Sequence, residues 1–207
     1  MARYCDSVCK LCRNEGTKLF LKGSRCYSSK CAIERRRYPS GQHGQERKKQ
    51  SEYAVQLREK QKVRRGYGLL ESQFSRYFET ASRQKAVPTG LRLLQLMEVR
   101  LDNIVHRSGL VPSRAQARQM IKHGHFTVNG KLVTIPSFQL KVGELVAPAE
   151  KSKALVKKLI ADNPSAGAPR WVAADLENLK VSVQQLPARE DLDQTIKEAL
   201  IVEFYSR

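Results

Sequence analysis

Two closely spaced cysteine pairs near the start of the chain constrain its fold more than any other feature. Two residues separate Cys9 from Cys12, thirteen residues follow, and four residues separate Cys26 from Cys31. Four thiolates at such spacings can surround one ion tetrahedrally, the geometry that Zn²⁺ favours. We therefore predict a zinc knuckle, with an iron–sulfur cluster on the same four cysteines as the alternative.

The fifth cysteine and the small apolar content bear on how this segment folds. Cys5 makes a C-x3-C-x2-C triad with Cys9 and Cys12, which resembles the cluster-binding motif of radical-SAM enzymes, but the chain lacks the βα repeats and the length of their barrels. Cys5 is then a spare thiol or a substitute ligand. Residues 1–44 have too few large apolar side chains to offset chain entropy alone. Metal binding supplies on the order of 10 kcal/mol in such modules, so we expect it to fold them.

The charge of the chain indicates a polyanionic partner. Its 207 residues carry a formal net charge of +18, with a pI near 10.0. Residues 1–50 hold 13 Lys and Arg against 4 Asp and Glu, which is half of the excess. Such a field attracts nucleic acid. No apolar run approaches the ~20 residues of a membrane span and the first residues lack a secretory signal, so we expect a cytoplasmic protein without a membrane partner.

A basic loop and three helices are predicted after the knuckle. Residues 35–44 mix arginines, Tyr38 and His43 with Pro and Gly, a composition typical of an arm that contacts phosphates and stacks on a base. Periodicity and caps predict helices over 51–65, with Ser51 as N-cap, from about residue 72, and from about 90 to 107.

The region after residue 112 predicts a basic helix beside a small sheet. Ser113 and Gln116 form a capping box, and Arg114, Arg118 and Lys122 then follow on one helix face with no acidic residue at i±4. Asn129-Gly130 predicts a type I′ hairpin between 125–128 and 131–135. Further strands are predicted at 145–147, 171–174 and 181–183, with a helix around 155–160.

These residues together resemble one family: the bacterial form of the fourth protein of the small ribosomal subunit, with the four-cysteine knuckle. The matching stretches are Val8-Cys9-Lys10-Leu11-Cys12-Arg13, Cys26-Tyr27-Ser28 with Cys31, Tyr38-Pro39-Ser40-Gly41-Gln42-His43-Gly44, residues 53–62, Arg100-Leu101-Asp102-Asn103, residues 113–119, residues 124–130 and residues 201–207. Residues 97 to 146 are also similar to an RNA-binding module that pseudouridine synthases and tyrosyl-tRNA synthetases carry beside a catalytic domain.

The resemblance implies a structural, non-enzymatic role on the ribosome. Members of this family bind the five-prime domain of small-subunit ribosomal RNA early in assembly. They lie beside the third and fifth proteins of the small subunit, near the channel through which messenger RNA enters, and influence decoding accuracy; some repress their own operon. No homo-oligomer is expected.

The expected architecture is α+β, in three parts. Residues 1–45 are the zinc knuckle and basic arm, 46–96 a mostly helical domain completed by about 180–207, and 97–179 an inserted RNA-binding module of two helices and a small β-sheet. The candidate metal ligands are Cys9, Cys12, Cys26 and Cys31. The candidate RNA-binding residues are Lys22, Arg35, Arg36, Arg37, His43, Lys48, Lys49, Tyr53, Arg58, Lys60, Lys62, Arg64, Arg65, Arg100, Arg107, Ser113, Arg114, Gln116, Arg118, Lys122, His123 and His125.

Two other classes of protein share some of these sequence features. A basic helix–turn–helix would also suit a DNA-binding regulator, but the hairpin directly after the helix and the lack of a dimerisation segment argue against it. An RNA-modifying enzyme would need a titratable pair in a cleft, and no such pair stands out in the sequence.

Overall fold

The computed structural model describes residues 3–46, 49–162 and 167–207. It divides into two compact units, Met1–Leu93 with Asp193–Arg207, and Leu94–Leu192. The knuckle thus shares a unit with the helices that follow it. Residues 180–192 belong to the second unit, whereas the sequence reading grouped them with the helical domain. Within the described ranges, no helix has the length and apolar character needed to cross a membrane.

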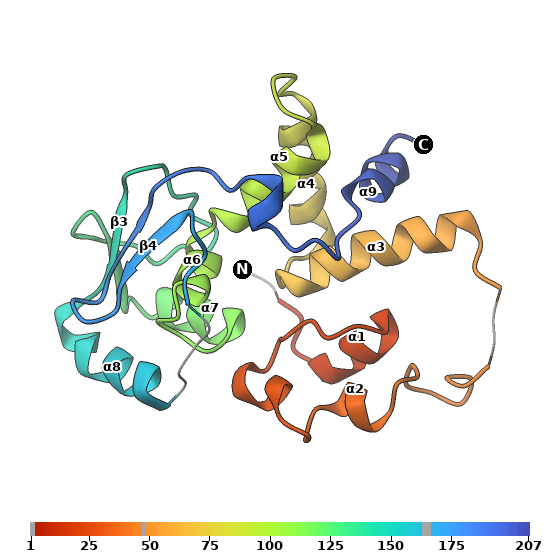
Figure 1. Cartoon of the computed structure of the whole chain (residues 1–207), viewed down its shortest axis with the longest axis horizontal. Coiled ribbons are helices and arrows are strands. Elements are labelled where there is room, and N and C mark those ends of the chain that lie inside the picture. Colours follow the sequence, from red (N-terminus) through yellow and green to blue (C-terminus); the bar gives the residue numbers. More distant parts are fainter. Residues whose placement is uncertain (1–2, 47–48, 163–166) are drawn as a thin grey trace. The chain divides into compact units, whose positions relative to one another are not determined.

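The first unit is built from helices and loops in its described residues (Figure 1). Its elements are α1 (Val8–Glu15), the 3₁₀ turn η1 (Gly23–Tyr27), α2 (Ala32–Arg35), α3 (Glu52–Gly66), α4 (Glu71–Ser82), α5 (Thr89–Glu98), which crosses the unit boundary, and α9 (Glu198–Tyr205). The predicted N-cap of α3 is confirmed, because the Ser51 Oγ accepts a hydrogen bond from the Ala54 N–H at 3.2 Å. A helix N-terminus leaves such donors without a backbone partner, so the cap stabilises it.

Helix α9 packs against α3, although about 130 residues separate them in sequence. Ile201 of α9 is buried, as are Phe74 and Ala81 of α4. The Tyr205 ring stacks on Phe78, with centroids 4.4 Å apart. The apolar stripe predicted for α4 is therefore core, and part of its partner comes from the distant C-terminal segment.

The knuckle forms a small core of its own within the first unit. Cys12, Leu19, Cys31 and Ile33 make up its buried cluster. Helix α1 also contacts α3, where the Glu15 carboxylate is 1% exposed and pairs with Arg58 and Arg65 of α3. Burial raises the pKa of Glu15, while the two arginines act to lower it.

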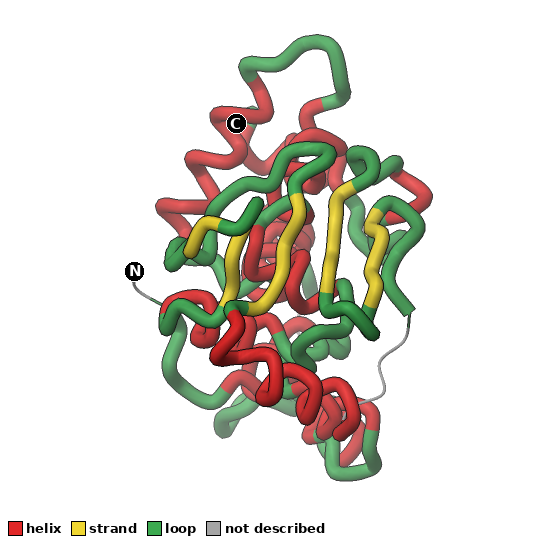
Figure 2. Tube along the Cα trace, turned by 90° about the vertical axis from the view of Figure 1, so that its left-hand side faces the viewer, coloured by secondary structure: helices red, strands yellow, loops and turns green. Residues whose placement is uncertain are grey.

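The second unit is an antiparallel sheet with helices packed on it. Its elements are α6 (Leu101–Arg107), α7 (Arg114–Lys122), β1 (Phe126–Val128), β2 (Lys131–Leu132), β3 (Leu145–Pro148), η2 (Glu150–Ser152), α8 (Lys153–Asp162), β4 (Val172–Asp175), β5 (Lys180–Val183) and η3 (Arg189–Asp191). The strand order is β2-β1-β3-β5-β4, and Figure 2 shows the strands side by side with helices behind them. The predicted hairpin is confirmed: Asn129 and Gly130 both have positive φ, at 48° and 77°, as a type I′ turn requires.

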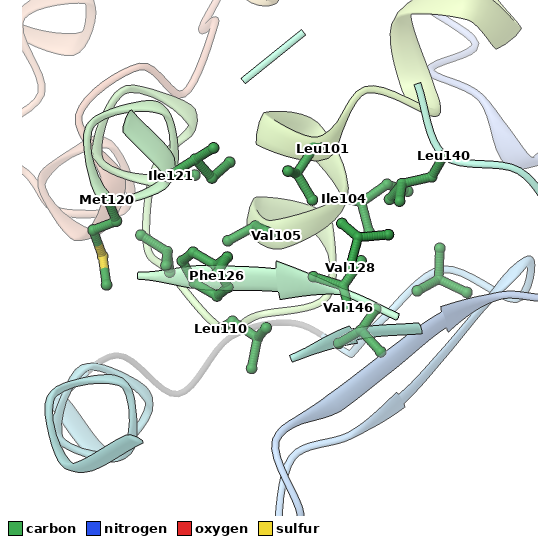
Figure 3. Packing of buried hydrophobic residues seen from close by; sticks show 14 of the residues in the cluster. Leu101, Ile104, Val105, Leu110, Met120, Ile121, Phe126, Val128, Leu140 and Val146 are labelled. Carbon is green, nitrogen blue, oxygen red and sulfur yellow. The ribbon is translucent and has the colours of Figure 1, made fainter. Parts of the chain in front are cut away.

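One hydrophobic cluster joins α6, α7 and α8 to the sheet. In the view of Figure 3, Phe126 and Val128 of β1 lie among side chains from α6, α7 and β3. Phe126, Ile104 and Ile121 are completely buried. The period-two pattern of β1 and the helical period of α6 and α7 therefore place their apolar faces in the same core.

The single helix predicted from about 90 to 107 is wrong, because the chain forms two helices. It breaks at Arg100, which has extended backbone (φ −65°, ψ 140°) and a side chain with no exposed surface. At the start of α6, the Leu101 N–H donates to the Phe138 carbonyl at 2.8 Å and the Asp102 N–H to the Pro136 carbonyl at 3.1 Å. The acceptors lie 34 and 37 residues further along the chain, so helical periodicity alone does not reveal them.

Candidate nucleic-acid interface

The four predicted metal ligands line one small pocket in the knuckle. Helix α1 supplies Cys9 and Cys12, η1 supplies Cys26, and Cys31 is the N-cap of α2. The rest of the lining is Val8, Leu21, Lys22, Ala32 and Ile33. Cys5 is exposed and does not line this pocket.

The surroundings of the thiols affect their ionisation. Burial raises the pKa of Cys12 and of Cys26, and the neighbouring cysteines raise both further, while backbone N–H groups act in the opposite direction. One of these donors is the Lys22 N–H, 3.3 Å from the Cys26 Sγ. No group of three or more His, Cys, Asp or Glu side chains in the described part of the chain is arranged as a ready metal site.

Cations with solvent-exposed side chains are concentrated on the knuckle and its arm. Lys22, Arg35, Arg36 and Arg37 are all exposed, and none of them forms an ion pair within the described part of the chain. Such side chains are available to phosphates. Lys49 is also exposed, and Lys48 lies outside the described residues.

The arm is anchored to the knuckle by Arg13, which the sequence reading missed. The Arg13 guanidinium donates to the carbonyls of Tyr38 and Pro39, at 2.8 and 3.1 Å, and lies 5.2 Å from the Tyr38 ring centroid. The Tyr38 ring therefore stacks on an arginine of its own chain. His43 remains exposed and pairs with Glu46.

Most cations of α3 are engaged within the first unit. Lys60 has a side chain only 6% exposed, pairs with Glu71 at 2.7 Å, and lies 4.6 Å from the Phe204 ring centroid. Lys62 donates to the Thr195 carbonyl at 2.6 Å. The prediction that these side chains contact RNA therefore conflicts with their burial and their partners.

The other α3 candidates also have protein partners. Arg58 and Arg65 pair with Glu15, and Arg64 donates to the Gln61 side chain at 2.8 Å. Tyr53 is half exposed, and its ring lies 5.6 Å from that of Phe204 and 6.0 Å from the Arg207 guanidinium. Helix α3 is thus chiefly a scaffold for α1 and α9.

In the second unit, an internal polar network ties α6 to α7. Arg100 makes two hydrogen bonds to the Asp102 carboxylate, at 3.0 and 2.6 Å. Arg118 is 12% exposed and lies 3.5 Å from the same carboxylate. No acidic residue lies at i±4 of Arg118 on its own helix, but Asp102 of α6 provides an acidic partner that the sequence pattern did not indicate.

A second set of polar contacts holds Arg114 and Arg107. The Arg114 Nε donates to the Asn103 Oδ1 at 2.7 Å, and the Asn103 Nδ2 donates to the Glu98 carboxylate at 2.6 Å. Arg107 pairs with Glu98 at 2.8 Å. Asp102, Asn103 and Glu98 were not among the candidate residues; the Arg-Leu-Asp-Asn run was the sequence signal that marked two of them.

The N-terminus of α7 is capped, and its C-terminal end is exposed to solvent. The predicted N-cap is confirmed, since the Ser113 Oγ accepts from the Gln116 N–H at 3.3 Å. Lys122 and His123 are exposed, and the described residues record no ion pair for Lys122. The His125 Nδ1 lies 2.7 Å from the Ser152 Oγ, which gives this histidine a partner inside the unit.

An exposed cationic knuckle and a small sheet backed by helices define a nucleic-acid-binding protein of mixed α and β structure. Residues 3–98 match the ribosomal protein S4/S9 N-terminal domain, and residues 99–146 match the S4 domain. The chain is 58% identical to the small ribosomal subunit protein uS4 of Ruminiclostridium cellulolyticum and 57% identical to that of Geotalea daltonii, each over the full length of both chains. The chain belongs to the uS4 family of small ribosomal subunit proteins. This is a family of structural ribosomal proteins, which confirms the expectation of a non-enzymatic chain.

Proposed function

We propose that this chain is a structural RNA-binding protein of the small ribosomal subunit in the cytoplasm, and that it binds the five-prime domain of the subunit's RNA early in assembly. The observation that carries the proposal is the run Arg35–Arg37, three adjacent exposed guanidinium groups with no ion pair recorded in the described residues. Arginine binds phosphate by paired hydrogen bonds, so a fixed run of this kind suits a folded RNA backbone.

The finer partners follow from the family resemblance. The third and fifth proteins of the small subunit are the expected protein neighbours. Messenger RNA near its entry channel into the ribosome is the second expected nucleic-acid partner. Through this contact the protein is expected to contribute to translational accuracy. Basic, exposed side chains at 35–37 and Lys49 would suit contact with either RNA, since phosphate contacts carry no sequence information.

The same proposal includes one structural zinc ion held by Cys9, Cys12, Cys26 and Cys31. The four thiols line one pocket, and a backbone N–H already lies at the Cys26 sulfur, a donor that would stabilise a thiolate ligand. A bound ion would link α1, η1 and α2 to one another and so stabilise a segment whose apolar core is small. An iron–sulfur cluster on the same ligands is the alternative, and metal analysis of the purified protein with its absorption spectrum separates the two.

The experiment for RNA binding measures affinity for deproteinised small-subunit RNA at several salt concentrations. If roughly 6–10 phosphates are neutralised, log K should fall against log salt with a slope of about −4 to −9. Changing Arg35, Arg36 and Arg37 to Gln should reduce the slope by roughly 2–3. Duplex DNA at the same salt is the control, and equal affinity for DNA, or a nearly flat salt dependence, contradicts the proposal.

A further inference from the structure

Two aromatic side chains lie exposed on the knuckle: Phe20 between its two cysteine pairs, and Tyr27 directly after Cys26. Tyr27 is 74% exposed and Phe20 is 39% exposed. Their rings stack on each other, with centroids 5.0 Å apart and planes inclined by 30°. Exposed large apolar groups are ordinary when scattered singly, but a stacked pair on a module this small forms a defined surface.

The backbone turns the Phe20 ring away from the core. Phe20 has φ +50°, a left-handed conformation that a bulky residue rarely adopts. Leu19 and Leu21, on either side of it, pack into the knuckle core, which contains neither Phe20 nor Tyr27. The fold thus tolerates both a strained residue and exposed apolar area at one place, a combination that is common at functional sites.

The surface around the rings is strongly cationic. No Asp or Glu occurs between Glu15 and Glu34. Lys22 follows Phe20 by two residues, and Arg25 precedes Tyr27 by two residues. Both cations are exposed, and neither forms an ion pair within the described part of the chain. A π-face flanked by free cations suits an unpaired nucleobase with its phosphates better than it suits an apolar protein segment.

We propose that Phe20 and Tyr27 form a stacking platform for an unpaired base of RNA, with Lys22 and Arg25 contacting the adjacent phosphates. This inference rests on the proposed function and deepens it, because it assigns part of the RNA-binding surface to base stacking. The Tyr27 ring, as the more exposed of the two, receives the base, and Phe20 supports it from beneath.

The test uses the full-length, metal-loaded protein and deproteinised small-subunit RNA. Tyr27→Leu removes the ring and keeps an apolar side chain, so RNA affinity should fall roughly 5- to 150-fold, the range expected for the loss of one base–aromatic stack. The slope of log K against log salt should stay unchanged, because no phosphate contact is lost. Tyr27→Phe is the matched control and should bind like the unmodified protein. Phe20→Asn, which tolerates the left-handed backbone, should weaken binding in the same direction.

Two further measurements make the result decisive. Lys22→Gln and Arg25→Gln should each reduce the salt slope by roughly one. Ultraviolet cross-linking of the unmodified protein, followed by mass spectrometry, should identify Tyr27 bonded to a nucleotide, and it needs no variant to fold. If the unmodified protein binds RNA while Tyr27→Leu binds equally well and no cross-link forms, the stacking platform is refuted. If the unmodified protein fails to bind, the proposed function itself is refuted.

Discussion

At the scale of single residues, the cations of this protein serve two different purposes, and burial separates them. Lys60 lies between the Glu71 carboxylate and the rings of Phe204 and Tyr205. Burial alone would raise the pKa of Glu71, but the hydrogen bonds from Lys60 and Tyr205 outweigh it, so the pKa of this carboxyl is lowered. Lys60 therefore holds α3, α4 and α9 together.

We predict that Lys60→Met lowers the free energy of unfolding by about 1–3 kcal/mol without changing the salt slope of RNA binding. Methionine keeps the apolar stem but loses the ion pair and the cation–π contacts. Denaturant unfolding and salt-dependent binding measure the two effects. Lys49→Met is the matched control at an exposed lysine, and we expect it to lower the slope and leave stability unchanged. If Lys60→Met instead lowered the salt slope and left stability unchanged, Lys60 would be an RNA-binding residue.

Because His106 is largely buried, we predict that the stability of the protein depends on pH. Burial, reinforced by Arg114 and Arg107 and opposed by the hydrogen bond to the Val111 backbone and by Glu98, lowers its pKa from the ordinary 6.5 to about 4. Its Nδ1 lies 3.2 Å from the Val111 carbonyl oxygen, so the Nδ1–H of the neutral ring donates a hydrogen bond to that oxygen.

Because the folded-state pKa is lower than the unfolded one, the unfolded chain binds the extra proton first. The stabilising contribution is complete above about pH 6.5 and is lost as pH falls toward 4, by roughly 2–3 kcal/mol. His106→Gln should flatten the stability profile in this window, as followed by thermal unfolding at pH 4 to 7. His123→Gln, at an exposed ring, is the control and should leave the profile as it is.

At the scale of the element, α7 shows how one predicted face divides into two roles. The spacing of Arg114, Arg118 and Lys122 correctly places them along one side of a helix. However, Arg118 is largely covered and pairs with Asp102, whereas Lys122 is exposed.

We predict that Lys122→Gln reduces the salt slope of RNA binding by roughly one and leaves stability within about 0.5 kcal/mol. Arg118→Gln should instead destabilise the second unit by about 1–3 kcal/mol, since it leaves part of a buried carboxylate network without its partner. Urea unfolding followed by the fluorescence of Trp171, which is buried in this unit, reports the difference. Equal stability of the two variants would show that the Asp102 contact contributes nothing.

Elements with local signals were predictable, and contacts between distant segments were not. The hairpin at Asn129-Gly130 and the N-caps Ser51 and Ser113 follow from neighbouring residues, and all three are confirmed. Three partners of the α3 cations, Glu15, Glu71 and Thr195, lie outside that helix, so no spacing within the helix reveals them. The break at Arg100 likewise depends on acceptors from Pro136 and Phe138. For the candidate site, the sequence indicated which residue types gather in the knuckle but not which cations are neutralised inside the fold.

At the scale of the whole molecule, folding of the knuckle should depend on the proposed zinc ion, whereas folding of the sheet should not. The knuckle cluster holds four buried residues, whereas the cluster of the second unit spans three helices and the sheet.

We predict that a strong chelator, or Cys9→Ser, disorders residues 1–44 and weakens RNA binding while the second unit stays folded. Hydrogen exchange resolved by segment measures this directly. Cys5→Ser is the control, since Cys5 is exposed and outside the pocket, and should retain the metal. Loss of metal from Cys5→Ser together with retention by Cys9→Ser would overturn the ligand assignment.

The split composition of the first unit also has a consequence for synthesis. Residues 94–192 are contiguous and can fold as soon as they have been translated, but α3 meets α9 only after that entire stretch has been made. Until then the face of α3 and α4 that will receive Ile201 and Tyr205 stays open to water and to other chains. The middle of the sequence can therefore complete its fold before the first unit does, and residues 1–50, which carry half of the net positive charge, belong to the unit that is completed last.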